Sequence, residues 1–291
     1  MAWARRRKLA AAVSTDWRSK FDRDGYVAVP NFLAAEDFDH LRDFILNSDF
    51  DTREQQQGDT VTRRVAIGPS IVARSRELRN LLGSSRWRSL LAYVASTRSQ
   101  PIYYIQTIAV GVTEGPPDPQ LALHSDTFHP SMKAWLFLTD VEADKAPLTY
   151  VAGSHRLTPE RLAWEQARSE NIKDADRLSQ RGSFRITPEE LPALRLPQPT
   201  AFAVSANTLV AIDTSGFHAR GTSEGPTTRV EIWAYSRRSP FLPWTGMDLL
   251  SSGPLAMRRA DWLMGFFDTL DRLGWRKQHW RPAGPRRPVD A

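Results

Sequence analysis

Residues 101–112 read PIYYIQTIAVGV, and this stretch decides the class of fold. It is rich in β-branched and aromatic residues and ends in a glycine-containing turn, a pattern that predicts a strand. Further short strands are predicted at 26–29, 133–138, 148–151, 201–204, 209–212 and 229–235. Helices are predicted before this region, at 33–46 and at 75–96 with a break near Gly83, and after it, at 257–273. Many short strands between flanking helices favour a mainly β fold, a sandwich or barrel with helices at both ends.

The composition is that of an ordinary soluble globular protein, with 41% hydrophobic and 25% charged residues among 291. Cysteine is absent, which excludes a disulfide scaffold and any metal site built on thiolates. The net charge of +6 gathers at the ends of the chain. We therefore expect a solvated basic tail at 1–20, a single domain at 21–280 and a second basic tail at 281–291.

Other classes of partner are not favoured. Basic residues do not alternate with aromatic ones along a groove, so nucleic acid is not expected. The apolar run at 9–13 is too short for a secretion signal and far short of a membrane span, so we expect a cytoplasmic protein. The helix at 257–273 mixes arginines with Trp262, Leu263, Phe266, Phe267 and Leu270. It could lie on an anionic membrane, but packing of these apolar residues on the sheet is the favoured interpretation.

The candidate chemistry begins with His124-Ser125-Asp126. Side chains at i and i+2 of a strand point to the same face, so His124 and Asp126 can bind one metal ion together. His218 follows 94 residues later (218 − 124) and is a candidate third ligand. Two imidazoles and one carboxylate leave positions on the metal open, as in non-haem iron(II) oxygenases. The motif His-x-Asp alone is weak, since a lone histidine is more often structural.

Arg229 strengthens the assignment, because it lies 11 residues after His218 (229 − 218) at the start of a predicted strand. A 2-oxoacid that chelates iron needs a fixed cation for its far carboxylate, and the planar guanidinium suits that role. A hairpin between the strands at 209–212 and 229–235 would bring Arg229 beside the metal.

The chain resembles the phytanoyl-CoA dioxygenase family of 2-oxoglutarate-dependent oxygenases. The matching segments are Phe21-Asp22-Arg23-Asp24-Gly25-Tyr26, Val29-Pro30-Asn31-Phe32-Leu33, His124-Ser125-Asp126, Lys145-Ala146-Pro147-Leu148, Val151-Ala152-Gly153-Ser154-His155, His218 and Arg229. The resemblance covers roughly residues 21–235. It implies a double-stranded β-helix (jelly-roll) core, iron(II), 2-oxoglutarate and O2 as co-substrates, and hydroxylation of an unactivated C–H bond with release of succinate and CO2.

The resemblance has departures. Lys145-Ala146 replaces the usual Asn-Gly, Ala152 replaces a proline, and Arg220 stands near His218 where many members carry a small polar residue. These changes leave the substrate class open. Related halogenases lack the metal-binding carboxylate, so Asp126 disfavours halogenation.

Further site residues are expected around this centre. Gln106 and Thr139 are candidates for co-substrate contacts, and the candidates for substrate contacts are Phe128, His129, Trp135, Arg220 and Trp233. Each has a structural alternative: core packing for the tryptophans, an exposed loop for His129, and an ion pair for Arg220. His155 is expected to be a structural turn histidine. Residues 157–180 form a polar insertion, either a lid or a surface excursion.

The expected substrate is a small molecule, with anionic and lipid-like compounds both compatible. The rival functions are a metal-dependent hydrolase built on the same ligands and a jelly-roll module that binds small molecules or carbohydrate without catalysis. The oligomeric state is open.

Overall fold

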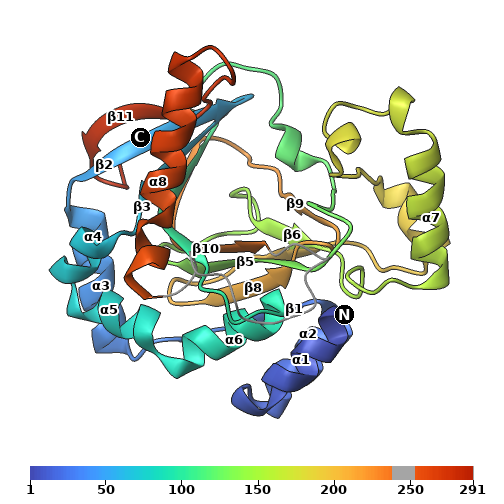
Figure 1. Cartoon of the computed structure of the whole chain (residues 1–291), viewed down its shortest axis with the longest axis horizontal. Coiled ribbons are helices and arrows are strands. Elements are labelled where there is room, and N and C mark those ends of the chain that lie inside the picture. Colours follow the sequence, from blue (N-terminus) through green and yellow to red (C-terminus); the bar gives the residue numbers. More distant parts are fainter. Residues whose placement is uncertain (238–252, 291) are drawn as a thin grey trace.

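The computed structural model describes residues 1–237 and 253–290, and its centre is a pair of facing antiparallel sheets (Figure 1). The larger sheet has the order β1-β8-β5-β10-β4-β3-β2-β11, and the smaller has the order β7-β6-β9. Together they form the expected double-stranded β-helix. The strands are β1 (Tyr26–Val29), β2 (Phe50–Gln57), β3 (Thr60–Ala66), β4 (Ile102–Val110), β5 (Ser131–Phe137), β6 (Leu148–Tyr150), β7 (Thr200–Phe202), β8 (Leu209–Asp213), β9 (His218–Arg220), β10 (Thr227–Arg237) and β11 (Arg281–Arg286).

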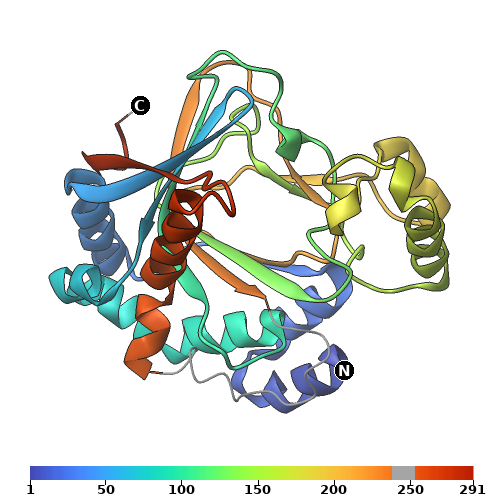
Figure 2. The ribbon, with the colours of Figure 1, turned by 45° about the horizontal axis from the view of Figure 1, so that its top comes forward.

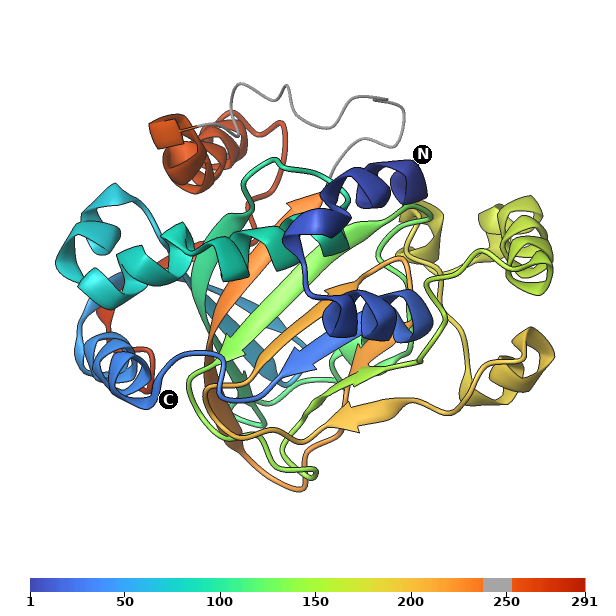
Figure 3. The same cartoon turned by 90° about the horizontal axis from the view of Figure 1, so that it is seen from below.

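Helices cover the outer face of the larger sheet, as Figure 3 shows from below. The helices are α1 (Ala2–Leu9), α2 (Thr15–Asp24), α3 (Ala35–Asn47), α4 (Pro69–Arg74), α5 (Arg76–Gly83), α6 (Ser85–Ala95), α7 (Pro159–Glu170) and α8 (Gly253–Arg272). The predicted break between α5 and α6 is confirmed: it falls at Ser84, whose hydroxyl accepts from the Trp87 N–H and so begins a new helix. Trp87 is fully buried against the sheet.

Side chains alternate between the two faces of the larger sheet, so that one face packs on the helices and the other faces the smaller sheet. In β10, Val230, Ile232 and Ala234 pack with the helices, whereas Trp233 packs in a second cluster between the sheets. Side chains of a strand alternate between its faces, so the odd-numbered residues of β10, Arg229 among them, face the smaller sheet. The helix-covered face holds the main apolar core, and the inner face is left for polar and aromatic groups.

The strands predicted from sequence are all present, but their pairing differs from the expectation. β8 pairs with β1 and β5, whereas β10 pairs with β4 and β5. The predicted hairpin between 209–212 and 229–235 is therefore wrong. In a jelly roll, strands adjacent in sequence cross between sheets, and here β5 lies between β8 and β10 while β9 belongs to the other sheet.

The hairpin of β2 and β3 is an addition to the predicted elements. It turns at Gly58, which adopts a φ of 63° and whose Cβ, if present, would lie 2.3 Å from the Pro116 carbonyl oxygen. The signal was in the sequence, since a Gly-Asp turn precedes the β-branched stretch at 60–66. β2 and β3 extend the larger sheet and supply one wall of the pocket described below.

The expectation of a solvated N-terminal tail is wrong for Arg5 and Arg6. Arg5 is buried and donates to the Ser96 carbonyl at 3.0 Å, and Arg6 donates to the Val94 carbonyl at 2.7 Å. These carbonyls lie at the C-terminal end of α6, where backbone acceptors lack intrahelical donors and cations are favoured. Arg6 also pairs with the fully buried Asp213 at 2.7 Å.

The C-terminal basic segment is ordered as well. β11 (Arg281–Arg286) pairs with β2, and the Pro288 carbonyl accepts a hydrogen bond of 2.8 Å from the buried Thr107 hydroxyl. The expected solvated tail at 281–291 is therefore wrong for these residues. The limits of the single domain, 21–280, stay a prediction.

The favoured packing of the apolar α8 residues is wrong for three of them. Trp262, Leu263 and Phe266 are 47%, 37% and 57% exposed. The helix packs through its small side chains instead, with Ala256 and Ala260 buried. Within the described residues, no helix is both long and apolar enough to span a membrane.

Candidate metal centre and pocket

Three ligand-type side chains meet between the two sheets. One nitrogen or oxygen atom from each of His124, Asp126 and His218 lies within 4.8 Å of the others. The Asp126 Oδ1 is 3.7 Å from Nε2 of each histidine. The structure thus brings together residues that lie 94 positions apart, as the sequence predicted.

The local backbone differs from the predicted strand. His124 forms an isolated bridge with His218, in which each N–H donates to the other's carbonyl at 3.0 and 2.9 Å. The Asp126 N–H donates to the Thr214 carbonyl at 2.9 Å. His124 and Asp126 therefore do not point to the same place because of alternation along a regular strand. Backbone bonds to the segment that carries His218 fix both residues.

The tautomers of the two histidines suit a metal ion. Nδ1 of His124 and Nδ1 of His218 lie 2.8 and 3.0 Å from the carbonyls of Ala122 and Gly216, so each Nδ1 carries the proton. Each Nε2 then directs a lone pair toward Asp126. The Nε2 of His218 is buried without a hydrogen-bond partner. A divalent metal ion bound between this nitrogen, the second imidazole and the carboxylate would satisfy the unpaired acceptor.

Electrostatics keep the ligands in their metal-binding forms. Burial lowers the pKa of His124 to about 3 and that of His218 to about 4, so both are neutral near pH 7. Burial would raise the pKa of Asp126, but Lys133 and the two histidines together hold it well below its ordinary value. The Lys133 Nζ lies 2.7 Å from Oδ2 of Asp126, which leaves Oδ1 toward the histidines.

A tight turn positions His218. The Asp213 Oδ1 accepts from the N–H and the hydroxyl of Ser215, at 3.0 and 2.8 Å. Gly216 is required next, because a Cβ there would lie 2.0 Å from the Tyr150 hydroxyl oxygen. The Phe217 N–H then donates to Ser154 Oγ at 2.8 Å. Side-chain hydrogen bonds thus replace regular secondary structure on both sides of the ligand.

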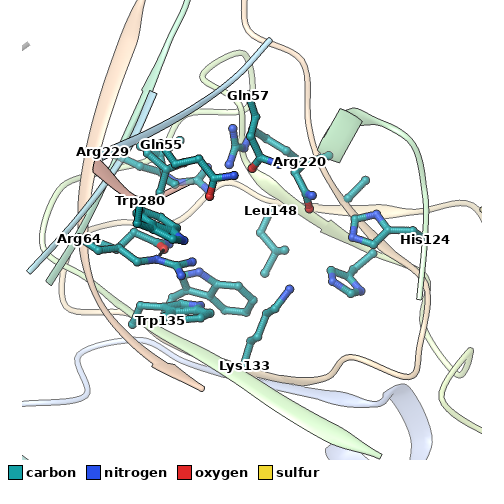
Figure 4. A pocket seen from close by; sticks show the side chains of 17 residues that line it. Gln55, Gln57, Arg64, His124, Lys133, Trp135, Leu148, Arg220, Arg229 and Trp280 are labelled. Atoms are coloured by element: carbon teal, nitrogen blue, oxygen red, sulfur yellow. Dashed lines mark hydrogen bonds between the residues drawn. The ribbon is translucent and has the colours of Figure 1, made fainter. Parts of the chain in front are cut away.

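A pocket of about 270 Å³ opens beside the two histidines (Figure 4). Of the residues predicted from sequence, those that line it are Gln106, Trp135, Arg220, Arg229 and Trp233. Segment 157–180 contributes none of the lining residues, and α7 projects away from the sheets in Figures 1 and 2.

Apart from the metal-ligand candidate Asp126, three predicted site residues do not line the pocket. Thr139 accepts from the Val230 N–H at 3.1 Å, a role in strand geometry. Phe128 is 62% exposed, and His129 is buried with Nδ1 at 3.1 Å from the Pro130 carbonyl. Neither residue is therefore placed at the pocket, and the alternative of an exposed loop position for His129 is wrong as well, because its side chain is buried. His155 packs on Phe21 at 5.5 Å between ring centroids, consistent with a structural role.

The cations predicted from sequence have partners. Arg220 forms an ion pair with the buried Asp118. Arg229 donates through Nε to Oε2 of Glu231 at 3.1 Å, and through an Nη to the Ala146 carbonyl. Glu231 is fully buried, and its Oε1 accepts from Gln106 at 2.7 Å. Arg229 is therefore held rigidly at the pocket wall with part of its charge compensated.

Several pocket residues come from segments without a predicted role. Gln55, Gln57 and Arg64 come from the β2–β3 hairpin, and Trp280 precedes β11. Sequence reasoning missed them because no motif marks them. Only the alternation along β3, together with its place beside β4, directs Arg64 inward.

The chain shows low sequence identity and limited structural similarity to solved structures. SnoN, described as a non-heme alpha ketoglutarate dependent epimerase from nogalamycin biosynthesis, is 19% identical, with 82% of this chain and 92% of that chain covered and a TM-score of 0.47. HygX from Streptomyces hygroscopicus, solved with nickel and 2-oxoglutarate bound, is 16% identical, with coverages of 80% and 90% and a TM-score of 0.47. No curated protein sequence matches the chain significantly.

Residues 21–193 match the family model described as phytanoyl-CoA dioxygenase (PhyH). This segment contains His124 and Asp126 but ends before His218 and Arg229, so the case for the last two rests on their positions in the fold. Because the match covers more than half of the chain, the protein belongs to the phytanoyl-CoA dioxygenase family and is an iron- and 2-oxoglutarate-dependent oxygenase.

Proposed function

We propose that the protein hydroxylates an unactivated C–H bond of a small molecule, with His124, Asp126 and His218 as iron ligands and Arg229 as the anchor of 2-oxoglutarate. The observation that carries the proposal is the convergence of two Nε2 atoms and one carboxylate oxygen at the edge of the pocket that Arg229 also lines. Iron bound there with 2-oxoglutarate and dioxygen would supply the oxidising power, with succinate and CO2 released.

The chain's own residues supply position and protection from water. The carbonyls of Ala122 and Gly216 accept from the Nδ1 atoms of His124 and His218 and so fix the orientations of the two rings. Glu231 and the Ala146 carbonyl hold the guanidinium of Arg229, so it needs little reordering to meet a carboxylate. None of the described side chains has to act as a general base, because the C–H bond is not cleaved by proton transfer.

The pocket restricts the substrate. A volume of about 270 Å³ fits a small molecule. Trp135 and Trp233 are paired across β5 and β10, and both line the pocket together with His124 and His218. A flat or apolar part of the substrate would pack against these tryptophan rings and exclude water from the reacting carbon.

The test is an anaerobic titration of the metal-free protein with iron(II) and then with 2-oxoglutarate, following the visible charge-transfer band of the chelate. The band is expected in the wild type, absent in His124→Ala and unchanged in His40→Ala, a control at an exposed histidine. In Arg229→Gln the band should require a much higher 2-oxoglutarate concentration, whereas the exposed control Arg98→Gln should behave as the wild type.

Exposure to air completes the test. Succinate formation without added substrate is expected to be slow, as uncoupled turnover, and to disappear in His124→Ala. If the wild type binds iron but shows neither the band nor succinate, the proposed assignment of this site is wrong.

A further inference from the structure

Of the cationic side chains that line the pocket, Arg64 is the one that forms no ion pair within the described part of the chain. Four cationic side chains line the pocket, and Lys133, Arg220 and Arg229 each form an ion pair with Asp126, Asp118 or Glu231. Among the described residues, no Asp or Glu forms an ion pair with Arg64. Its Nε instead donates to the neutral Oε1 of Gln106 at 2.8 Å.

Two indole rings enclose the Arg64 guanidinium. Its central carbon lies 4.0 Å from the ring centroid of Trp233 and 4.5 Å from that of Trp280. Burial lowers the pKa of Arg64 to about 10, so the group remains charged at neutral pH. The two indole rings cover the faces of the guanidinium, and Nε is hydrogen-bonded to Gln106. A ligand can therefore reach the group through its terminal nitrogens, in the plane of the guanidinium. An in-plane fork binds a carboxylate or phosphate through two parallel hydrogen bonds.

Arg64 lies across the cavity from the metal centre. Figure 4 shows Arg64 and Trp280 on one side of the cavity and His124 on the other. Arg229 lies on the same side as Arg64 in this view. The two arginines are linked indirectly, because Gln106 accepts from Arg64 and donates to Glu231, which accepts from Arg229. Arg64 therefore lines the cavity wall opposite the metal ligands, on the same side as the proposed 2-oxoglutarate anchor Arg229.

We propose that Arg64 is a subsite for an oxyanion, carboxylate or phosphate, of the primary substrate. The substrate is then an amphipathic small molecule whose apolar part packs on Trp135, with its anionic end at Arg64 and its reacting carbon at the metal. Arg220, the anion-binding candidate from sequence, is paired with Asp118 and is not needed for this role. The position of the reacting carbon rests on the proposed function, whereas the binding of the anion does not.

The test is calorimetric titration of the full-length protein, loaded anaerobically with iron(II) and saturating 2-oxoglutarate, with three probes: 3-phenylpropionate, phenyl phosphate and the neutral 3-phenylpropanamide. At least one anionic probe should bind more tightly than the amide. Loss of a charged fork should weaken that anion about 10-fold to 100-fold in Arg64→Met, which retains an unbranched apolar chain between the rings. Arg98→Met, at an exposed position, should bind all probes as the wild type does.

Both the comparison of probes and the comparison of variants can overturn the proposal. If no anion binds better than the amide, or if Arg64→Met binds the anion as tightly as the wild type, Arg64 is not an anion subsite. If 2-oxoglutarate competes with the anionic probe, and Arg229→Gln rather than Arg64→Met weakens it, the probe occupies the co-substrate position. The wild-type comparison of probes stands even if Arg64→Met fails to fold.

The same titration on metal-free protein separates the two proposals. Probe binding that depends on Arg64 without iron or 2-oxoglutarate supports the anion subsite, whatever the outcome of the charge-transfer experiment. A normal charge-transfer band without any preference for the anionic probes supports the metal-site assignment and overturns the subsite.

Discussion

Removal of Arg6 from its ion pair with Asp213 should cost several kcal/mol of stability, although Arg6 belongs to a segment that the sequence predicts to be a solvated tail. Asp213 is fully buried and Arg6 is 12% exposed, with 2.7 Å between Nη2 and Oδ2. Removing one partner of a buried pair costs about 3–5 kcal/mol, because the other charge is left uncompensated. Three donors from Ser131 and Ser215 still bond Oδ1 of Asp213, so we expect a loss of about 3 kcal/mol for Arg6→Met.

That loss corresponds to a fall in melting temperature of about 5 °C, from an unfolding entropy of about 2 cal/mol/K per residue. Urea unfolding and calorimetry of the metal-free protein measure both quantities. Arg7→Met is the matched control, because Arg7 is exposed and stacks on the exposed Trp3. Affinity for iron(II) should also fall in Arg6→Met, since Asp213 begins the turn that positions His218.

A double-mutant cycle isolates the pair. Arg6→Met combined with Asp213→Asn removes both charges, so the double variant should be more stable than the sum of the single losses predicts, by about 2–3 kcal/mol. Additive losses, or an Arg6→Met protein as stable as Arg7→Met, would refute the reasoning and show that the N-terminal helix contributes little.

Three further changes test other parts of the structure. Burial lowers the pKa of His155 to about 4, so between pH 6.5 and 4 the unfolded chain binds one more proton and stability falls by about 1.4 kcal/mol per unit as pH falls. Urea unfolding across this range should show a shallower loss for His155→Gln, and equal slopes would contradict it. Gly216→Ala should lower iron(II) affinity at least ~10-fold by calorimetry, because its Cβ would meet the Tyr150 hydroxyl. Lys133→Met should raise the pKa of Asp126, so metal binding should be lost at a higher pH as the solution is acidified; an unchanged profile would argue against this.

The sequence by itself determined the class of fold and the identity of the metal-binding set. Alternation and turn residues located the strands because each strand must bury one face, a local requirement that a single segment expresses. His124, Asp126 and His218 could be chosen because few residue types bind iron and their order along the chain is distinctive. Gln106, Trp135, Arg229 and Trp233 were also candidates from the sequence, and all four line the pocket.

Only the tertiary structure decided how the segments meet. Strand order depends on long-range pairing, so the predicted hairpin before β10 was wrong and the β2–β3 wall went unnoticed. The charge state of a site depends on partners distant in sequence: Asp118 neutralises Arg220, 102 residues away, and Glu231 compensates Arg229, while Arg64 is left with aromatic neighbours. The basic N-terminus likewise became part of the core because the end of α6 and Asp213 both present oxygen atoms to it, a coincidence in space that no local pattern encodes.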